Sequence, residues 1–410
     1  MRIRGWAAMA TVSAALAGLT GLTFPVAAAA AAPANCTPET GSPVTGLSQT
    51  LPWAQVALGL KSGGVWTLTR GAGVVVGVVD TGVTPLAGVL PANTAVRPGL
   101  SVLPGGGRGD LDCKGHGTEV AAIIAGRPGL ATFQGVAPDA VIVPVKAMEQ
   151  TETSGAQGPA AIAAGIVAAV DNGARVVNVS LVSTADTPEL EAAVQHALAK
   201  NVLIVAATGN NADTGPRYPA AIPGVLGVGA TAADGQVAPE TEVGGNAAIG
   251  APGDAIVTVN AAQPQNPYPI TDNGTSFATP FVTGTAALIL AYRPNLTPPQ
   301  LIHRIEATAD RPTTGYLPDP RIGWGVVNPY RAVTAELPEE QGTATATATA
   351  TTATPQPMSL PAATPPKTDR ATHAAVLAML AAVLLACLVP AATIALHAGR
   401  RRGWRVGGAK

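Results

Sequence analysis

The chain has 410 residues, of which 47% are hydrophobic and only 3% aromatic, and its formal net charge is -1 at neutral pH. This length is enough for one large domain with appended segments, and the core must consist mainly of Val, Ala, Leu and Ile. A charge so close to zero gives no support to binding of nucleic acid or of a generally anionic partner.

The first segment has the three parts of a secretory signal peptide. Basic residues precede an apolar run from Trp6 to Val26, and an alanine-rich stretch from Ala27 to Ala32 offers a cleavage zone. A membrane anchor that is never cleaved is the alternative for this run. We expect residues 1–31 to be removed and residues 32–52 to form an N-terminal extension.

Residues 53–335 are predicted to form an α/β domain, because apolar β-branched runs alternate with helical patterns of small residues. Such alternation is typical of a parallel sheet with helices on both faces. The predicted strands are Val74–Val79, Val141–Val145, Arg175–Leu181, Val202–Ala207 and Val225–Ala230. The predicted helices are Thr118–Ala125, Pro159–Asn172, Pro188–Lys200, Ser276–Tyr292 and Pro298–Ala309. Functional residues then belong at the carboxyl ends of the strands.

Three short motifs carry an acid, a base and a nucleophile. Asp80 closes the first predicted strand in Val-Val-Asp-Thr-Gly, His116 opens a helix in Gly-His-Gly-Thr, and Ser276 opens another in Gly-Thr-Ser-Phe-Ala-Thr-Pro. The chain order Asp, His, Ser is one of those known for hydrolytic triads. Each motif alone also has a structural interpretation, such as a capped turn at Asp80. The three in this order predict nucleophilic catalysis.

The chemistry suggests a role for each residue. The hydroxyl of Ser276 is a poor nucleophile until His116 takes its proton, and Asp80 would orient the imidazole and stabilise its cation. A tetrahedral oxyanion needs two donors, for which the candidates are the backbone N–H of Ser276 and the side-chain amide of Asn210. Asn210 could alternatively satisfy a turn. The sequence has no phosphate loop, paired metal-ligand histidines or calcium-type loop, so no cofactor or metal is expected.

The C-terminal part predicts a stalk and an anchor. Residues 336–370 are rich in Thr, Ala and Pro and cannot bury enough apolar surface to fold. Ala374–Leu396 is an uncharged apolar stretch long enough to cross a hydrocarbon core, which needs about 20 residues. We assign the transmembrane helix to residues 371–398 and a basic cytoplasmic tail to residues 399–410. The domain would then lie outside the cell membrane on a single-pass anchor; a buried core helix is the alternative.

The cysteines fit this topology. Cys36 and Cys113 face the same oxidising compartment, whereas Cys387 falls within the predicted membrane span. A disulfide between Cys36 and Cys113 is predicted, provided that their geometry allows it. It would fasten the N-terminal extension close to His116.

The three catalytic motifs resemble those of the subtilisin-like serine proteases, over roughly Trp53–Ala332. Within that family the sequence is most similar to the mycosins, the membrane-anchored proteases of type VII secretion systems. Its predicted signal peptide, stalk and anchor support this, as do Cys113, the segment Phe133–Ala140 and the phenylalanine after Ser276. The resemblance implies a subtilisin-type α/β fold, with Asp80, His116 and Ser276 as the triad and Asn210 in the oxyanion hole.

The resemblance also implies a substrate-binding segment at Ser180, Leu181 and Gly209. The family pattern there continues with two glycines, whereas this chain has Val182 and Ser183, whose side chains could narrow or redirect the cleft. The short stretch between residue 31 and the first catalytic motif leaves no room for a separate prodomain. We therefore expect the N-terminal extension to wrap the domain and to leave the cleft open.

The function implied is a membrane-tethered secreted endopeptidase that cleaves exported proteins, with a second role in stabilising a secretion membrane complex. Two alternatives stay open. The protein could be mainly a structural component of such a complex, or it could be a leader peptidase for secreted peptides.

Overall fold

The computed structural model describes residues 51–340, except for 62, 129–132, 150–157, 213, 245, 260, 263–268 and 313–315. The chain divides into two units, Met1–Ala344 and Thr345–Lys410, and every described residue belongs to the first. The predicted signal peptide, transmembrane helix and tail lie outside the described residues, as do nearly all of the N-terminal extension and of the stalk. These assignments stay predictions.

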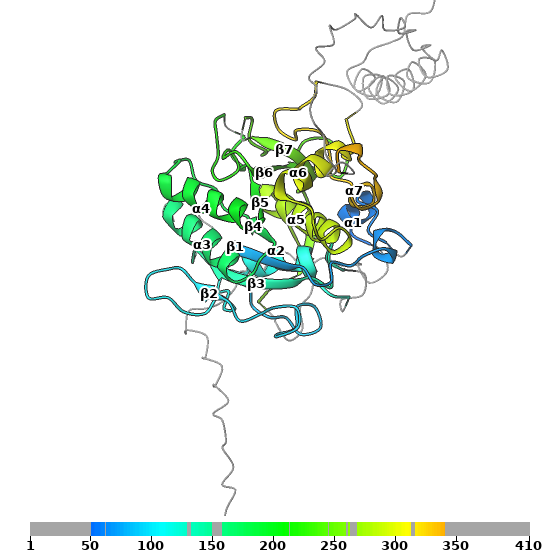
Figure 1. Cartoon of the computed structure of the whole chain (residues 1–410). Helices are drawn as coiled ribbons and strands as arrows, with labels where there is room; N and C mark the ends of the chain where they lie inside the picture. Colours follow the sequence, from blue (N-terminus) through cyan, green and yellow to red (C-terminus); the bar gives the residue numbers. More distant parts are fainter. Residues whose placement is uncertain are drawn as a thin grey trace, which may run out of the picture. The chain divides into compact units, whose positions relative to one another are not determined.

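A seven-stranded sheet forms the centre of the domain, and all of its neighbouring strands are parallel (Figure 1). In spatial order the strands are β2 (Leu100–Ser101), β3 (Val141–Lys146), β1 (Val75–Asp80), β4 (Val176–Val179), β5 (Leu203–Ala207), β6 (Val225–Thr231) and β7 (Ala247–Pro252). Most are continuous apolar runs, as expected for strands that are covered on both faces. The predicted parallel α/β sheet is confirmed.

Helices cover both faces of this sheet (Figure 1). One layer contains α3 (Pro159–Asp171) and α4 (Pro188–Ala199), and the other contains α2 (His116–Ala125) and α5 (Thr275–Tyr292). Successive strand residues point to opposite faces. Val76 and Val78 of β1 accordingly belong to the core under α2 and α5, whereas Val79 belongs to the core under α3 and α4.

Several elements were not predicted from the sequence. They are α1 (Trp53–Ala57), the 3₁₀ turns Val65–Thr67 and Pro338–Glu340, the short helix α7 (Pro329–Thr334), the edge strands β2 and β7, and the antiparallel pair β8 (Ile256–Val259) and β9 (Pro269–Asp272). The helix α6 was predicted and spans Pro298–Ala307. The missed elements are short, and segments of this length show too little hydrophobic periodicity to be recognised.

α5 is long and apolar enough to cross a membrane, and it is the one helix among the described residues with that property. Most of its side chains are buried, and they pack into the same core as the strands of the sheet. It is therefore the central core helix of this domain. The predicted membrane span at residues 371–398 lies outside the described part of the chain.

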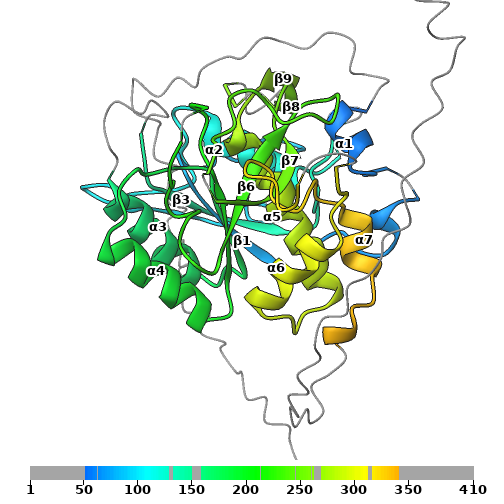
Figure 2. The same cartoon turned by 90° about the horizontal axis from the view of Figure 1, so that it is seen from above.

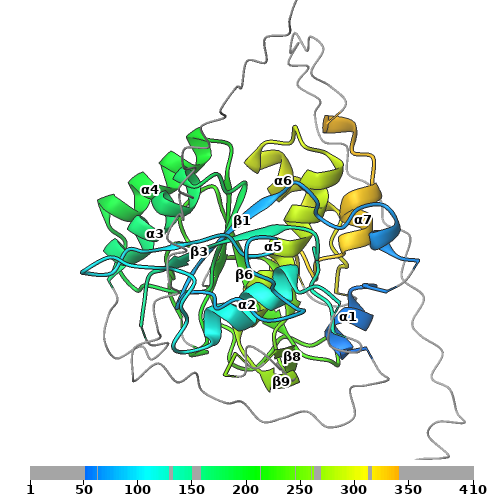
Figure 3. The ribbon, with the colours of Figure 1, turned by 90° about the horizontal axis from the view of Figure 1, so that it is seen from below.

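The described residues before β1 lie against the surface of the domain (Figures 2 and 3). The indole N–H of Trp53 donates to the carbonyl of Ala255, just before β8, at 3.0 Å. The indole N–H of Trp66 donates to the carbonyl of Val136 at 2.8 Å. None of the described residues up to Arg70 lines the cleft at the carboxyl ends of the strands.

The last described residues are held by a buried arginine. Arg304 of α6 has 0% exposed surface. Its Nη1 donates to the carbonyls of Ala332 and Ala335 at 2.8 and 2.9 Å, and its Nε donates to a carboxylate oxygen of Glu340 at 2.7 Å. Its Nη2 donates to the other oxygen of Glu340. This set of bonds fastens the end of the domain to its core.

We expect Arg304→Met to lower the free energy of unfolding by about 3–5 kcal/mol, because breaking a buried ion pair leaves its partner carboxylate uncompensated. Arg331→Met is the matched control, since it removes an ion pair with Asp310 whose side chains are 52% and 53% exposed. It should cost less than about 1 kcal/mol. Urea unfolding followed by tryptophan fluorescence measures both. Equally small losses would contradict an anchoring role for Arg304.

Candidate active site

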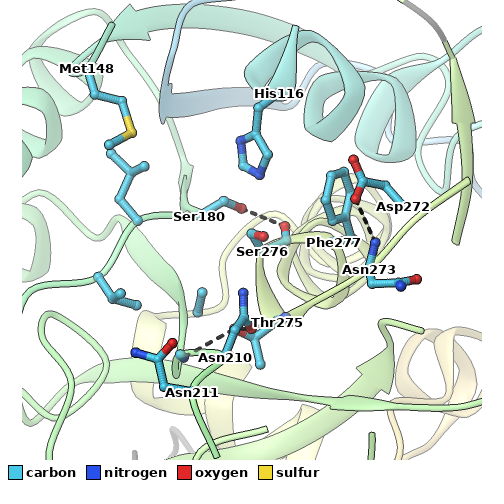
Figure 4. A pocket seen from close by; sticks show the side chains of 14 residues that line it. His116, Met148, Ser180, Asn210, Asn211, Asp272, Asn273, Thr275, Ser276 and Phe277 are labelled. Carbon is cyan, nitrogen blue, oxygen red and sulfur yellow. Dashed lines mark hydrogen bonds between the residues drawn. The ribbon is translucent and has the colours of Figure 1, made fainter. Parts of the chain in front are cut away.

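A cleft of about 360 Å³ opens at the carboxyl ends of the strands (Figure 4). The predicted residues that line it are His116, Ser180, Leu181, Gly209, Asn210 and Ser276. Asp80, also predicted, lies behind His116 with 0% exposed surface. Cys113 precedes the histidine by three residues, but Cys36 lies outside the described residues, so their pairing stays a prediction.

Asp80 and His116 form a direct pair. Asp80 ends β1, and its Oδ1 accepts hydrogen bonds from His116 Nδ1 and from the backbone N–H of Thr81, each at 2.7 Å. Because a carboxylate only accepts, the proton of this bond belongs to Nδ1 and the neutral ring has its free lone pair on Nε2. Figure 4 shows the imidazole above Ser276, with a ring nitrogen pointing toward it.

A buried carboxylate fixes the start of α2. Asp112 Oδ1 accepts from the N–H groups of Lys114 and Gly115 at 3.0 and 2.8 Å. Its Oδ2 accepts from the N–H and the hydroxyl of Thr118 at 2.9 and 2.6 Å. Asp112 was not predicted from the sequence. An aspartate four positions before His116 is the available signal, since Asp side chains cap helix starts.

Close packing explains the glycine after His116. A Cβ atom on Gly117 would lie 2.1 Å from the carbonyl oxygen of Gly82 and 2.9 Å from the Cβ of Asp80. α2 can therefore approach the turn after β1 only without a side chain at this position. That approach is what brings the imidazole within hydrogen-bond distance of the Asp80 carboxylate.

The surroundings favour the imidazolium form of His116. Burial lowers its pKa, but the charge of Asp80 and the hydrogen bond that His116 donates to that residue raise it by more. With smaller contributions from Glu119 and Asp272, the pKa of His116 rises to about 9. Glu119 lies one turn later on α2, and its own burial raises the pKa of its carboxyl, while His116 opposes that rise. The site is thus arranged to stabilise a ring that gains a proton.

Ser276 lies in the first turn of α5, where N–H groups have no partner within the helix. The N–H of Thr275 donates to Asn210 Oδ1 at 2.7 Å. The N–H groups of the two residues after Ser276 donate to the carbonyl of Gly274 at 3.0 and 3.2 Å. The N–H of Ser276 has no such acceptor within the described part of the chain, and it stays available at the cleft.

The amide of Asn210 has a fixed orientation. Its Oδ1 accepts from the N–H and the hydroxyl of Thr275 at 2.7 and 2.8 Å, and that hydroxyl accepts from the N–H of Gly209 at 3.1 Å. Because a backbone N–H only donates, the oxygen must face Thr275 and Nδ2 must face away. Gly274 has φ 115°, and a Cβ there would lie 2.7 Å from this Nδ2. A side chain at this position would displace the amide.

The two walls of the cleft differ. Ser180, Leu181 and Val182 form one wall, so a side chain does replace the family glycine at 182. Ser183 is not among the lining residues; it exchanges backbone hydrogen bonds with Tyr218 at 2.8 and 2.9 Å. On the other wall, the ring of Phe277 meets that of His116 edge-on, with centroids 5.1 Å apart. Within the described residues, no three His, Cys, Asp or Glu side chains gather as metal ligands.

Comparison with known proteins decides the family. The model of the subtilase family matches residues 71–325. The chain belongs to the subtilase family. Mycosin-4 of Mycobacterium tuberculosis is 34% identical over 391 residues, which cover 84% of this chain and 81% of that protein. A thermostable alkaline protease of Halalkalibacterium halodurans is 35% identical over 70% of this chain and 74% of its own length.

Solved structures agree with this membership. The MycP3 protease from the type VII (ESX-3) secretion system has a TM-score of 0.62 and 33% identity, covering 72% of this chain and 92% of that one. A chain of an intact ESX-5 inner membrane complex has a TM-score of 0.66 and 28% identity, covering 89% and 96%. The protein is a subtilisin-like serine endopeptidase related to the mycosins.

The pKa of His116 can be measured directly. We expect its ring to titrate near 9 in NMR spectra of the protein, with the resonance identified by its loss in His116→Gln. Asp80→Asn should lower this pKa to about 6.5 or less. The variant removes the carboxylate that stabilises the imidazolium, while burial of the ring still disfavours its charged form. An unchanged pKa of His116 in Asp80→Asn would contradict the pairing with Asp80.

Proposed function

We propose that the protein is a membrane-tethered serine endopeptidase that cleaves exported proteins, with Ser276 as nucleophile, His116 as base and Asp80 as its orienting acid. The observation that carries this proposal is the 2.7 Å bond between Asp80 and His116, in a cleft that also contains the Ser276 side chain. Membership of the subtilase family supports the same reaction class.

The reaction would proceed in two halves. His116 Nε2 takes the hydroxyl proton as Ser276 Oγ attacks the peptide carbonyl carbon, and the resulting imidazolium lies against the Asp80 carboxylate. The C–N bond then breaks, and the proton passes to the leaving amine. In the second half, water attacks the acyl-enzyme ester with His116 again as base, which releases the acid product and the free hydroxyl.

Two donors would stabilise the tetrahedral oxyanion. One is the N–H of Ser276, which has no acceptor in the first turn of α5, and the other is Asn210 Nδ2, which the bonds to Thr275 turn away from that residue. Both are held by backbone contacts before substrate arrives. Donors aimed in advance at the developing charge stabilise the transition state without reorganisation.

A second role in a secretion complex has its own support. The chain resembles a component of an ESX-5 inner membrane complex over 89% of its length. The predicted anchor at residues 371–398 would hold the domain at the outer surface of the membrane, beside such a complex. We therefore propose that the protein associates with a type VII secretion complex and acts on proteins that this complex exports.

We expect a Ser276→Ala strain to lose specific new N-termini among its exported proteins while their export continues. Deletion of the gene should abolish both the cleavage and the export. N-terminal proteomics of culture filtrates measures both effects. Export unaffected by deletion would contradict the second role, and unchanged N-termini in Ser276→Ala would contradict the protease assignment. Changes confined to leaders of short secreted peptides would favour the leader peptidase.

Asn210→Ala should lower kcat by about 10²–10³-fold with little change in KM, a magnitude known from the corresponding donor in subtilisin. The amide contributes only when the oxyanion forms, so binding of the ground state does not depend on it. Thr275→Val is the control, because it keeps the Asn210 amide but removes the hydroxyl that helps to orient it. This variant should lose less of kcat than Asn210→Ala does. A rise in KM alone after Asn210→Ala would contradict an oxyanion role.

A further inference from the structure

The backbone carbonyl of Ser276 cannot be satisfied in the usual helical way. In an α-helix each carbonyl accepts from the N–H four residues later. For Ser276 that residue is Pro280, which lies inside α5. Proline has no N–H to donate. The residue proposed as the nucleophile therefore lacks the bond that normally fixes a residue in its helix.

A side chain just after β4 takes the place of this missing donor. The hydroxyl of Ser180 donates to the carbonyl of Ser276 at 2.8 Å (Figure 4). Since a carbonyl only accepts, the single hydroxyl proton of Ser180 is committed to this bond. Its oxygen in turn accepts from Asn178 Nδ2 at 2.9 Å. Neither the proton nor this lone pair remains free for a substrate.

The network returns to the same helix two turns later. Asn178 Oδ1 accepts from the hydroxyl of Thr283 at 2.9 Å. Asn178 and Thr283 have 0% exposed surface, and Ser180 has 6%. Ser276 and Thr283 are seven residues apart and share one face of α5, while Asn178 and Ser180 are two residues apart on one face of the chain through β4. A buried chain of three hydrogen bonds therefore joins the two elements.

The same strand also sets the position of the acid. β4 pairs in parallel with β1, with Asn178 opposite Val78, two residues before Asp80. The carbonyl of Ser276 is thus tied to the strand pair from which Asp80 emerges. A shift of α5 along its axis would move the nucleophile relative to His116 and would break the network at both ends.

We propose that Ser180 is a positioning residue for the reaction: its hydroxyl replaces the N–H that Pro280 lacks and fixes Ser276 along α5. The proposal rests on Ser276 being the nucleophile. Ser180 then has two separate roles. Its side chain positions Ser276, while the backbone of residues 180–182 remains free to line the cleft for a peptide. The side chain acts through Ser276 and does not contact the substrate.

A fluorophosphonate probe tests this on the full-length protein in membranes, because Ser276 Oγ displaces fluoride from its phosphorus without further substrate recognition. Ser180→Ala should lower the maximal labelling rate by about tenfold, as expected for one lost buried hydrogen bond, and leave the half-saturating probe concentration within about twofold. Ser180→Thr keeps the hydroxyl and should recover most of the loss. A change in half-saturation alone would overturn the proposal in favour of a ligand contact.

The decisive comparison uses Pro280→Ala, which restores an N–H four residues after Ser276. In that background Ser180→Ala should lower the labelling rate by less than about threefold, because the two changes are coupled. The same loss in both backgrounds would overturn the proposal. If Ser180→Ala alone does not fold, recovery of folded and labelled protein in the double variant supports the proposal, and its failure while Pro280→Ala folds contradicts it.

Failure of the underlying assignment gives a different result. If Ser276 is not the nucleophile, peptide mapping of the unmutated protein will find the phosphonyl group on another residue, whatever occupies position 180.

Discussion

The structure depends on one constraint: the first turn of α5 must lie where the carboxyl ends of β1, β4 and β5 open at the same edge of the sheet. The carboxyl ends of parallel strands all lie at the same edge of the sheet, so the topology alone brings them together there. Most residues of α5 are buried, and its first residues bond to the residues just after β4 and β5. The apolar core thereby fixes a polar site.

The polar groups of the site are held by one another before any substrate binds. Asp112 fixes the start of α2, Thr275 fixes the Asn210 amide, and Ser180 occupies the carbonyl of Ser276. The second and third of these bonds connect segments that are distant in the sequence. Buried hydrogen bonds of this kind contribute modestly to stability when made and cost more when one partner is removed. The arrangement therefore favours a single geometry.

Much of this could be predicted from the sequence, and the reason is physical. The parallel strands are continuous apolar runs, so β1, β3, β4, β5 and β6 were found within a few residues of their observed bounds. Glycines and other small residues flank Asp80, His116 and Ser276 in the sequence. Few other structures require such residues at these positions, so the three motifs could be recognised. The cleft is also lined by Asn210, Ser180, Leu181 and Gly209, whose proposed roles stay predictions.

The supporting residues could not be found in the same way. Asn178, Thr275 and Thr283 are ordinary polar residues in the sequence, and their roles arise only when α5 comes together with β4 and with the residues just after β5. The strands β8 and β9 were missed because each has four residues and they pair only across an intervening loop. Side-chain partners across long sequence separations leave no periodic pattern to read.

The most direct test of the central claim is whether Ser276 and His116, the partner of Asp80, act as one unit. It compares cleavage rates of a substrate peptide by Ser276→Ala, His116→Ala and the double variant, with protein of equal folded content. Each single change should lower kcat by about 10⁶-fold, the magnitude known for subtilisin, and the double variant should lose no more than either. Losses that multiply in the double variant, or a single variant close to the unmutated rate, would contradict the account.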